Sequence, residues 1–142
     1  MNKPNLIISN SLSFDEHIKR ITDAKDKIHS GTFEFATAIV DAIDQLDDNT
    51  IHSRIAERLG MHRSTLSRWI DIGSNQTLMN RRKTLPSSFG VLHTLTRIEK
   101  KYVEHFGKLQ GNINFLKLFD DGSITNNTER PDVLEILEVI DN

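Results

Sequence analysis

Basic side chains gather in one part of the chain, between residues 51 and 85. The range holds seven lysines and arginines and two acidic residues, so its formal charge is +5. The whole 142-residue chain has a formal charge of −2, so the remaining residues carry −7. The basic residues are Arg54, Arg58, Arg63, Arg68, Arg81, Arg82 and Lys83. A basic patch on an otherwise acidic chain is typical of a phosphate-binding surface.

Other kinds of site chemistry find no support in the sequence. The chain has no cysteine, its six histidines form no HExxH pair, and its glycines form no GxxxxGK or GxGxxG loop. Ser64 and Ser67 have no evident base beside them, so we do not interpret them as nucleophiles. We therefore expect no catalytic residue, no metal and no cofactor.

The element that must position residues 54–59 is a helix predicted from Ile51 onward. Its apolar face consists of Ile51, Ile55 and Leu59, and the Thr50 hydroxyl is expected to cap its first turn. The small side chain of Ala56 would let another helix approach closely. Gly60 provides the backbone freedom to leave this helix sharply.

A second helix is predicted to follow within the range 50–72, which makes the pair a helix-turn-helix. Leu66, Trp69 and Ile70 recur at helical spacing and are expected to face the first helix. The outward side chains are then His62, Arg63, Ser64, Ser67 and Arg68.

The string IAERLGMHRSTLSRWI resembles the helix-turn-helix of bacterial, plasmid and phage DNA-binding proteins. These include partition proteins of the ParB and KorB kind and the DNA-binding ends of resolvases. In that family the second helix enters the major groove, so the resemblance implies that residues 62–68 contact bases and phosphates. A looser similarity in LPSSFGVLHTLTRIEK and DDGSITNNTERPDVLEIL implies no residue roles.

The resemblance and the chemistry of each side chain suggest separate roles in binding double-stranded DNA. Arginine can bond guanine O6 and N7 together, which discriminates by about 1 to 3 kcal/mol, so Arg63 and Arg68 are expected to read bases. Shorter contacts to base or phosphate are expected from Ser64, Thr65 and Ser67, with His62 donating to phosphate. Backbone contacts are expected from Arg54, Arg58, Arg81, Arg82 and Lys83, although a solvated charge cluster equally explains residues 81–83.

The rest of the sequence predicts an all-α fold of about five to seven helices. A capping box of Ser13 and Glu16 begins an amphipathic helix that ends near Gly31, and a more apolar helix follows from Thr32 to Leu46. Residues 73–86 have no clear period and are expected to form a loop. Further helices are expected after Ser87 and Ser88 as far as Phe106, over 112–119, and over 128–140 with Pro131 in the first turn.

Three regions follow from these elements. They are a loose segment over 1–12, a helical DNA-binding domain over 13–119 with the helix-turn-helix at 50–72, and a C-terminal segment over 120–142. The last helix is apolar enough to need a partner, either the rest of the monomer or a second copy, and we favour a homodimer. No apolar run is long enough for a membrane span or a secretory signal, so we expect a cytoplasmic, nucleoid-associated protein without a membrane partner.

The expected function is sequence-specific DNA binding, foremost as a transcriptional repressor or regulator of phage or plasmid type. Plasmid partition or replication-origin binding is an alternative, since it needs the same DNA contact. A helical adaptor or inhibitor that binds another protein is a different class, and the acidic N-terminal half would be its surface.

Overall fold

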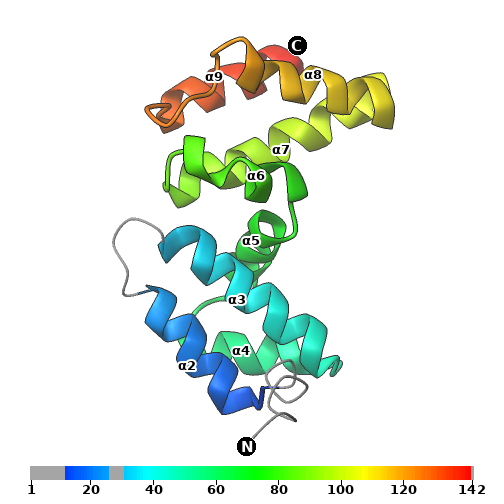
Figure 1. Ribbon diagram of the computed structural model, residues 1–142. Helices are drawn as coiled ribbons and strands as arrows, with labels where there is room; N and C mark the ends of the chain where they lie inside the picture. Colours follow the sequence, from blue (N-terminus) through cyan, green and yellow to red (C-terminus); the bar gives the residue numbers. More distant parts are fainter. Residues whose placement is uncertain (1–11, 26–30, 142) are drawn as a thin grey trace, which may run out of the picture. The chain divides into compact units, whose positions relative to one another are not determined.

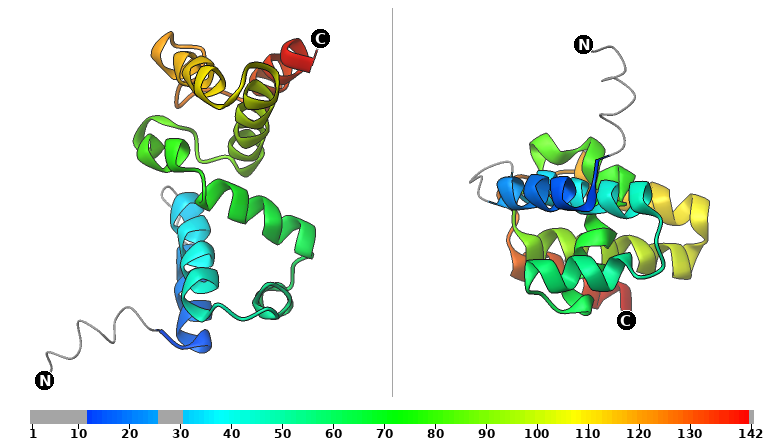
Figure 2. Two further views of the ribbon diagram at one scale, coloured as in Figure 1. Left: turned by 90° about the vertical axis from the view of Figure 1, so that its right-hand side faces the viewer. Right: turned by 90° about the horizontal axis from the view of Figure 1, so that it is seen from below.

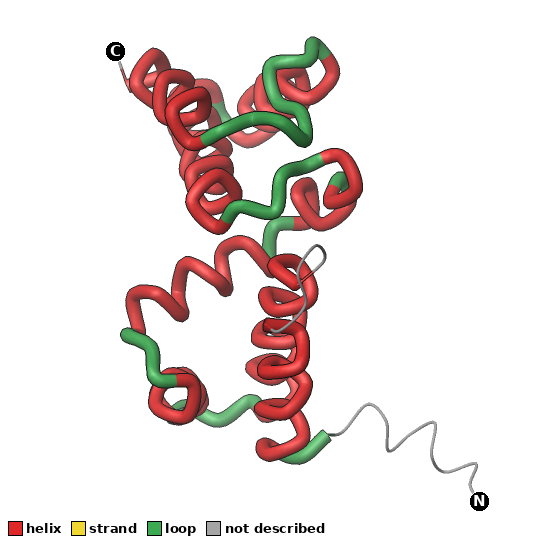
Figure 3. The backbone as a smooth tube through the Cα atoms, turned by 90° about the vertical axis from the view of Figure 1, so that its left-hand side faces the viewer, coloured by secondary structure: helices red, strands yellow, loops and turns green. Residues whose placement is uncertain are grey.

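The computed structural model describes residues 12–25 and 31–141, and within these ranges it contains helices and loops but no strand (Figure 3). The all-α prediction is confirmed. The chain divides into two compact units, Met1–Ser74 and Asn75–Asn142. This boundary lies inside the range 13–119 that the sequence analysis treats as one domain.

The first unit contains four described helices (Figure 1). They are α2 (Phe14–Lys25), α3 (Gly31–Leu46), α4 (Ile51–Leu59) and α5 (Arg63–Gly73). α2 and α3 pack side by side in opposite directions (Figure 2). The predicted end of the first helix near Gly31 lies outside the described residues, and Gly31 itself begins α3.

The capping box that begins α2 is confirmed. The Ser13 backbone N–H donates to Glu16 Oε1 at 2.9 Å, and the Glu16 backbone N–H donates to Ser13 Oγ at 3.2 Å. Each side chain thus satisfies a backbone donor that the first helical turn leaves without a partner.

The core of the first unit is formed by the apolar faces of all four helices. Fully or nearly fully buried residues are Ile21, Ala24, Phe35, Ala38, Ile39, Ala42, Ile51, Ile55, Ala56 and Leu66. His17 of α2 is buried as well, and its Nε2 lies 3.1 Å from the Gln45 side-chain oxygen of α3. Burial lowers the pKa of His17, because the charged imidazolium loses its hydration.

The second unit is built around its longest helix. Its elements are α6 (Gln76–Asn80), the 3₁₀ turn η1 (Arg82–Thr84), α7 (Phe89–Phe106), α8 (Lys108–Asp120) and α9 (Arg130–Asp141). Both α8 and α9 pack on α7. Gly111 permits the approach of α8, since a Cβ there would lie 2.6 Å from the Val103 Cα of α7.

Two expectations for the second unit are corrected by the structure. Residues 73–86 are not a plain loop but contain α6 and η1, because the Asn75 side chain caps α6 by accepting from the Leu78 N–H at 3.0 Å and Leu78 is fully buried. α8 begins at Lys108 rather than at residue 112. Its buried aromatic residue is Phe115, whereas Ile113, which helical spacing over 112–119 predicts to face inward, is 40% exposed.

The partner of the last helix is found within the chain. Val133 and Leu137 of α9 are buried in the second unit, where α9 packs on α7. Leu134 and Val139 of the same helix remain exposed. The apolar face of α9 therefore has a partner in the monomer, and the homodimer stays a prediction.

Candidate nucleic-acid interface

The turn between α4 and α5 has the geometry that the sequence predicts. Gly60 ends α4 in the left-handed conformation, with φ 68° and ψ 36°. Its N–H donates to the Glu57 carbonyl at 3.2 Å, and the Met61 N–H donates to the Ala56 carbonyl at 3.0 Å. No atom lies within 4 Å of a Cβ built at Gly60, so glycine is favoured here by the backbone angle and not by space.

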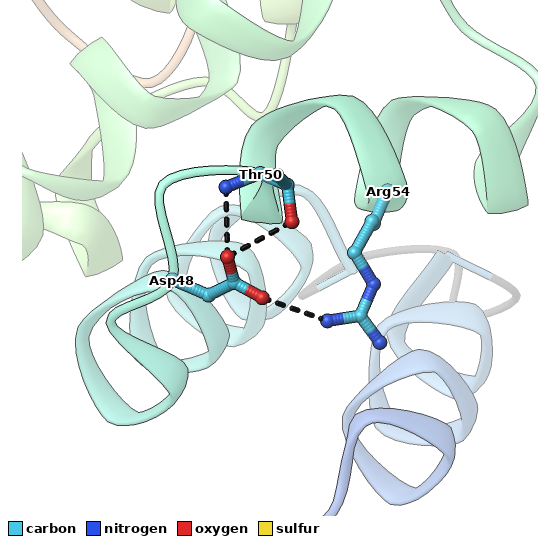
Figure 4. A network of polar contacts seen from close by, with 3 residues as sticks. All are labelled: Asp48, Thr50 and Arg54. Atoms are coloured by element: carbon cyan, nitrogen blue, oxygen red, sulfur yellow. Dashed lines mark hydrogen bonds and ion pairs between the residues drawn. The ribbon is translucent and has the colours of Figure 1, made fainter.

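The start of α4 corrects one expectation. Thr50 precedes the helix, but its hydroxyl does not cap it. Instead both its N–H and its hydroxyl donate to Asp48 Oδ1, at 2.8 and 2.9 Å (Figure 4). These bonds hold the pKa of Asp48 below its ordinary value, because they stabilise the carboxylate. Asp48 therefore organises this turn, since an aspartate bonds the backbone two residues ahead more strongly than threonine does.

The outward side of α5 carries the predicted reading residues. His62, Arg63, Ser64, Ser67 and Arg68 are exposed, and Thr65 is half-buried. His62 stands at the N-cap in an extended conformation, without a side-chain capping bond. The side chains of Arg63 and Arg68 make no ion pair or hydrogen bond with any residue in the described ranges. This face thus presents two guanidinium groups that have no described ion-pair partner, with hydroxyl groups between them.

The inward side of α5 is held mainly by α3. Leu66 is buried, and the half-buried Trp69 ring lies edge-on to Phe35 with 4.6 Å between the ring centroids. Helical spacing predicts that Trp69 faces the first helix of the motif, and it does not predict this contact with Phe35 of α3. At the end of α5, a Cβ on Gly73 would lie 2.6 Å from the Ala36 carbonyl oxygen of α3. α5 is therefore supported near both of its ends.

Arg54 and Arg58 of α4 differ from the arginines of α5, because each already has an acidic partner. Arg54 Nη1 donates to Asp48 Oδ2 at 3.1 Å, and Arg58 Nη1 donates to Asp15 Oδ1 at 3.0 Å. Their guanidinium carbons lie 4.4 and 5.2 Å from the centroid of one ring, that of Phe14. A phosphate would have to compete with these carboxylates for the two arginines.

Sequence reasoning missed these partners of Arg54 and Arg58. Asp48 could have been found, since an aspartate often accepts a hydrogen bond from the backbone two residues ahead of it, and here that residue precedes a helix. Phe14 and Asp15 could not, because about forty residues separate them from α4 and only the packing of α2 on α4 brings them together.

The remaining basic residues, Arg81, Arg82 and Lys83, belong to the second unit. Arg81 Nη1 lies 3.7 Å from Asp120 Oδ1, and its guanidinium is 5.2 Å from the Phe119 ring centroid. Arg82 Nη1 donates to the Met79 carbonyl at 2.7 Å. These three residues form a cluster of their own around η1.

The described residues form neither a metal-binding cluster nor a membrane-spanning helix. They contain no group of three or more histidine, aspartate or glutamate side chains placed to hold a metal ion. Among the described helices none combines the length and the apolar character needed to cross a membrane.

Comparison with known proteins gives no relative for the chain. No protein-family model matches it, and neither a curated protein nor a solved structure does. The resemblance of residues 55–70 to known helix-turn-helix motifs therefore remains a prediction, and function must be argued from the geometry.

Proposed function

We propose that this chain binds duplex DNA sequence-specifically through the outward face of α5. One observation carries the proposal. Arg63 and Arg68 stand exposed on a helix whose opposite side is packed on α3, and no described acidic side chain neutralises them. An α-helix fits the major groove of B-DNA, where the edges of all four base pairs can be told apart.

The proposed roles follow from the length and the charge of each side chain. Arg63 and Arg68 read bases, Ser64, Thr65 and Ser67 contact base or phosphate, and His62 donates to phosphate. Arg54 and Arg58 supply weaker backbone contacts, since Asp48 and Asp15 already hold them. The alanine variant of Arg68 is expected to lose preference at one base position and to keep most non-specific binding. Equal weakening on all sequences would assign Arg68 to phosphate contact instead.

The biological use that we propose first is regulation of transcription. The chain would be a regulator of phage or plasmid type that acts as a homodimer on DNA in the cytoplasm. Partition or replication-origin binding would use the same face, so the proposed contact does not separate them. The genomic position of the bound sites distinguishes the two functions, because the sites of a repressor overlap promoters.

The test is selection of bound duplexes from a random pool at moderate salt, with the full chain, followed by sequencing. The Arg63→Gln, Arg68→Gln double variant is the matched control, because both side chains are exposed and their loss leaves the fold intact. A consensus enriched by the native chain and not by this variant is the expected result. A two-fold symmetric consensus would in addition indicate a dimer and give the half-site spacing. No enrichment by the native chain would refute the proposal.

A protein-binding adaptor is the second candidate. It is favoured by exposed apolar side chains in the second unit, with Phe106 53%, Leu109 78% and Val139 68% exposed. Salt dependence distinguishes the two classes. Binding to DNA phosphates weakens steeply with salt, whereas an interface of apolar side chains does not.

A further inference from the structure

A surface hollow of the second unit has basic side chains around it. Its volume is about 420 Å³, and it is lined by Asn80, Arg81, Arg82, Lys83 and Thr84. The hollow thus lies at the junction of α6 and η1, in the stretch that the sequence predicted as a loop.

Both guanidinium groups at the hollow have a partner within the second unit. Arg82 Nη1 donates to the Met79 carbonyl at 2.7 Å, and the Arg81 guanidinium lies 3.7 Å from Asp120 Oδ1 and 5.2 Å from the Phe119 ring centroid. An arginine side chain that is already ordered loses less conformational entropy when it binds an anion. These contacts reduce the conformational entropy that the two guanidinium groups would lose on binding a negatively charged group.

The charge of the hollow is not balanced by its surroundings. Of its three basic residues, Arg81 has the carboxylate Asp120 as a partner, whereas Arg82 bonds only an uncharged carbonyl. The Lys83 ammonium group makes no ion pair or hydrogen bond with any residue in the part of the chain that the structure describes. Lys83 is exposed and lines the hollow, so its ammonium group is accessible to an anion there.

We propose that this hollow binds a phosphate group, with Arg82 and Lys83 as its main ligands and the Asn80 amide as a further donor. Phosphate suits the hollow because guanidinium groups bond two phosphate oxygens side by side and lysine adds a point charge. The same chemistry is offered by the backbone of a nucleic acid and by a free polyphosphate. The proposal does not depend on what α5 binds.

The experiment is a titration of the full chain with sodium pyrophosphate at constant ionic strength, followed through backbone amide resonances by NMR. Saturable shifts confined to residues 80–84 are expected. The Arg82→Gln, Lys83→Gln double variant should weaken the binding about tenfold or more, since charge-assisted contacts are lost. Lys83→Gln alone should weaken it severalfold, and it cannot act through the fold because its side chain has no described partner.

The matched control is Arg97→Gln, Lys100→Gln, which removes two exposed basic residues from α7 of the same unit. This control and the Arg63→Gln, Arg68→Gln variant should bind pyrophosphate like the native chain. Shifts that do not saturate, or equal weakening by the control pair, would overturn the proposal and indicate general charge attraction.

A duplex-binding arm identifies the source of the phosphate. The salt dependence of duplex binding is measured as the slope of log affinity against log salt concentration. If the Arg82→Gln, Lys83→Gln variant has a slope shallower by about two units, the hollow is assigned to a nucleic-acid backbone. An unchanged slope with loss of pyrophosphate binding would assign it to a free phosphate compound. Failure of the native chain to bind DNA would refute the function proposed for α5 and leave the pyrophosphate result standing.

Discussion

Asp15 forms an ion pair with Arg58 of the proposed interface. Removing the charge of Asp15 therefore tests whether Arg58 contacts DNA. Its carboxylate lies 3.0 Å from Arg58, whose guanidinium also lies over the Phe14 ring. The substitution Asp15→Asn keeps the size of the side chain and removes its charge. We expect the variant to bind duplex DNA more tightly, because Arg58 would no longer divide its charge between a carboxylate and a phosphate.

The size of the expected change in affinity follows from the exposure of the two side chains. The side chains of Arg58 and Asp15 are 48% and 79% exposed, so solvent screens the pair strongly. Exposed pairs contribute at most about 1 kcal/mol, and the affinity should therefore rise by up to about fivefold. If Arg58 then neutralises one phosphate, the slope of log affinity against log salt becomes steeper by about 0.9.

The assay is duplex binding by fluorescence anisotropy at four or five salt concentrations. Asp23→Asn is the control, because it removes the same charge from the same helix, where the partner is Lys19. Asp15→Asn should also have no effect when Arg58 is already glutamine, which a double-mutant cycle would show. An Asp15→Asn chain that is folded but binds with unchanged affinity and slope would refute the reasoning and place Arg58 away from the DNA.

Two further predictions concern stability. Gly111→Ala should lower the free energy of unfolding by about 1 to 3 kcal/mol in urea titrations, because its Cβ would lie 2.6 Å from the Val103 Cα. Gly90→Ala is the control: its nearest neighbour would be 3.4 Å away at the end of a flexible side chain, so an equal loss would contradict the argument. Burial lowers the pKa of His17, so the folded chain binds fewer protons than the unfolded chain, and stability should fall as pH drops below about 6.5. The slope is at most about 1.4 kcal/mol per pH unit. His17→Leu should abolish this part of the pH dependence, and a pH profile unchanged by that variant would show that His17 does not cause it.

Local signals in the sequence sufficed for much of the first unit. Ser13 with Glu16 marked the start of α2, and Gly60 marked the end of α4, because a capping box and a left-handed glycine act within a few residues. The outward position of Arg63 and Arg68 followed from helical spacing. These features are local in the chain, so spacing and residue type were enough to predict them.

Features that depend on packing were beyond the same reasoning. α6 was missed because a five-residue helix with Leu78 as its one buried residue has no measurable period. The Phe14 ring under two arginines was missed because nothing near residue 14 indicates which helix will lie over it. The DNA-reading role of α5 remains a prediction from chemistry and exposure.

The support of α5 has a consequence for the thermodynamics of any association at its outward face. Trp69 on Phe35 and the close approach of Gly73 to Ala36 pack this helix against α3 before a partner arrives. Association would then order only side chains such as Arg63 and Arg68, at about 0.5 to 1.5 kcal/mol each. Bending α5 to suit an imperfect groove would disturb this packing, so part of the adjustment would fall on the duplex. DNA sequences that deform easily would thus bind more tightly, and this preference would extend to base pairs that no side chain contacts.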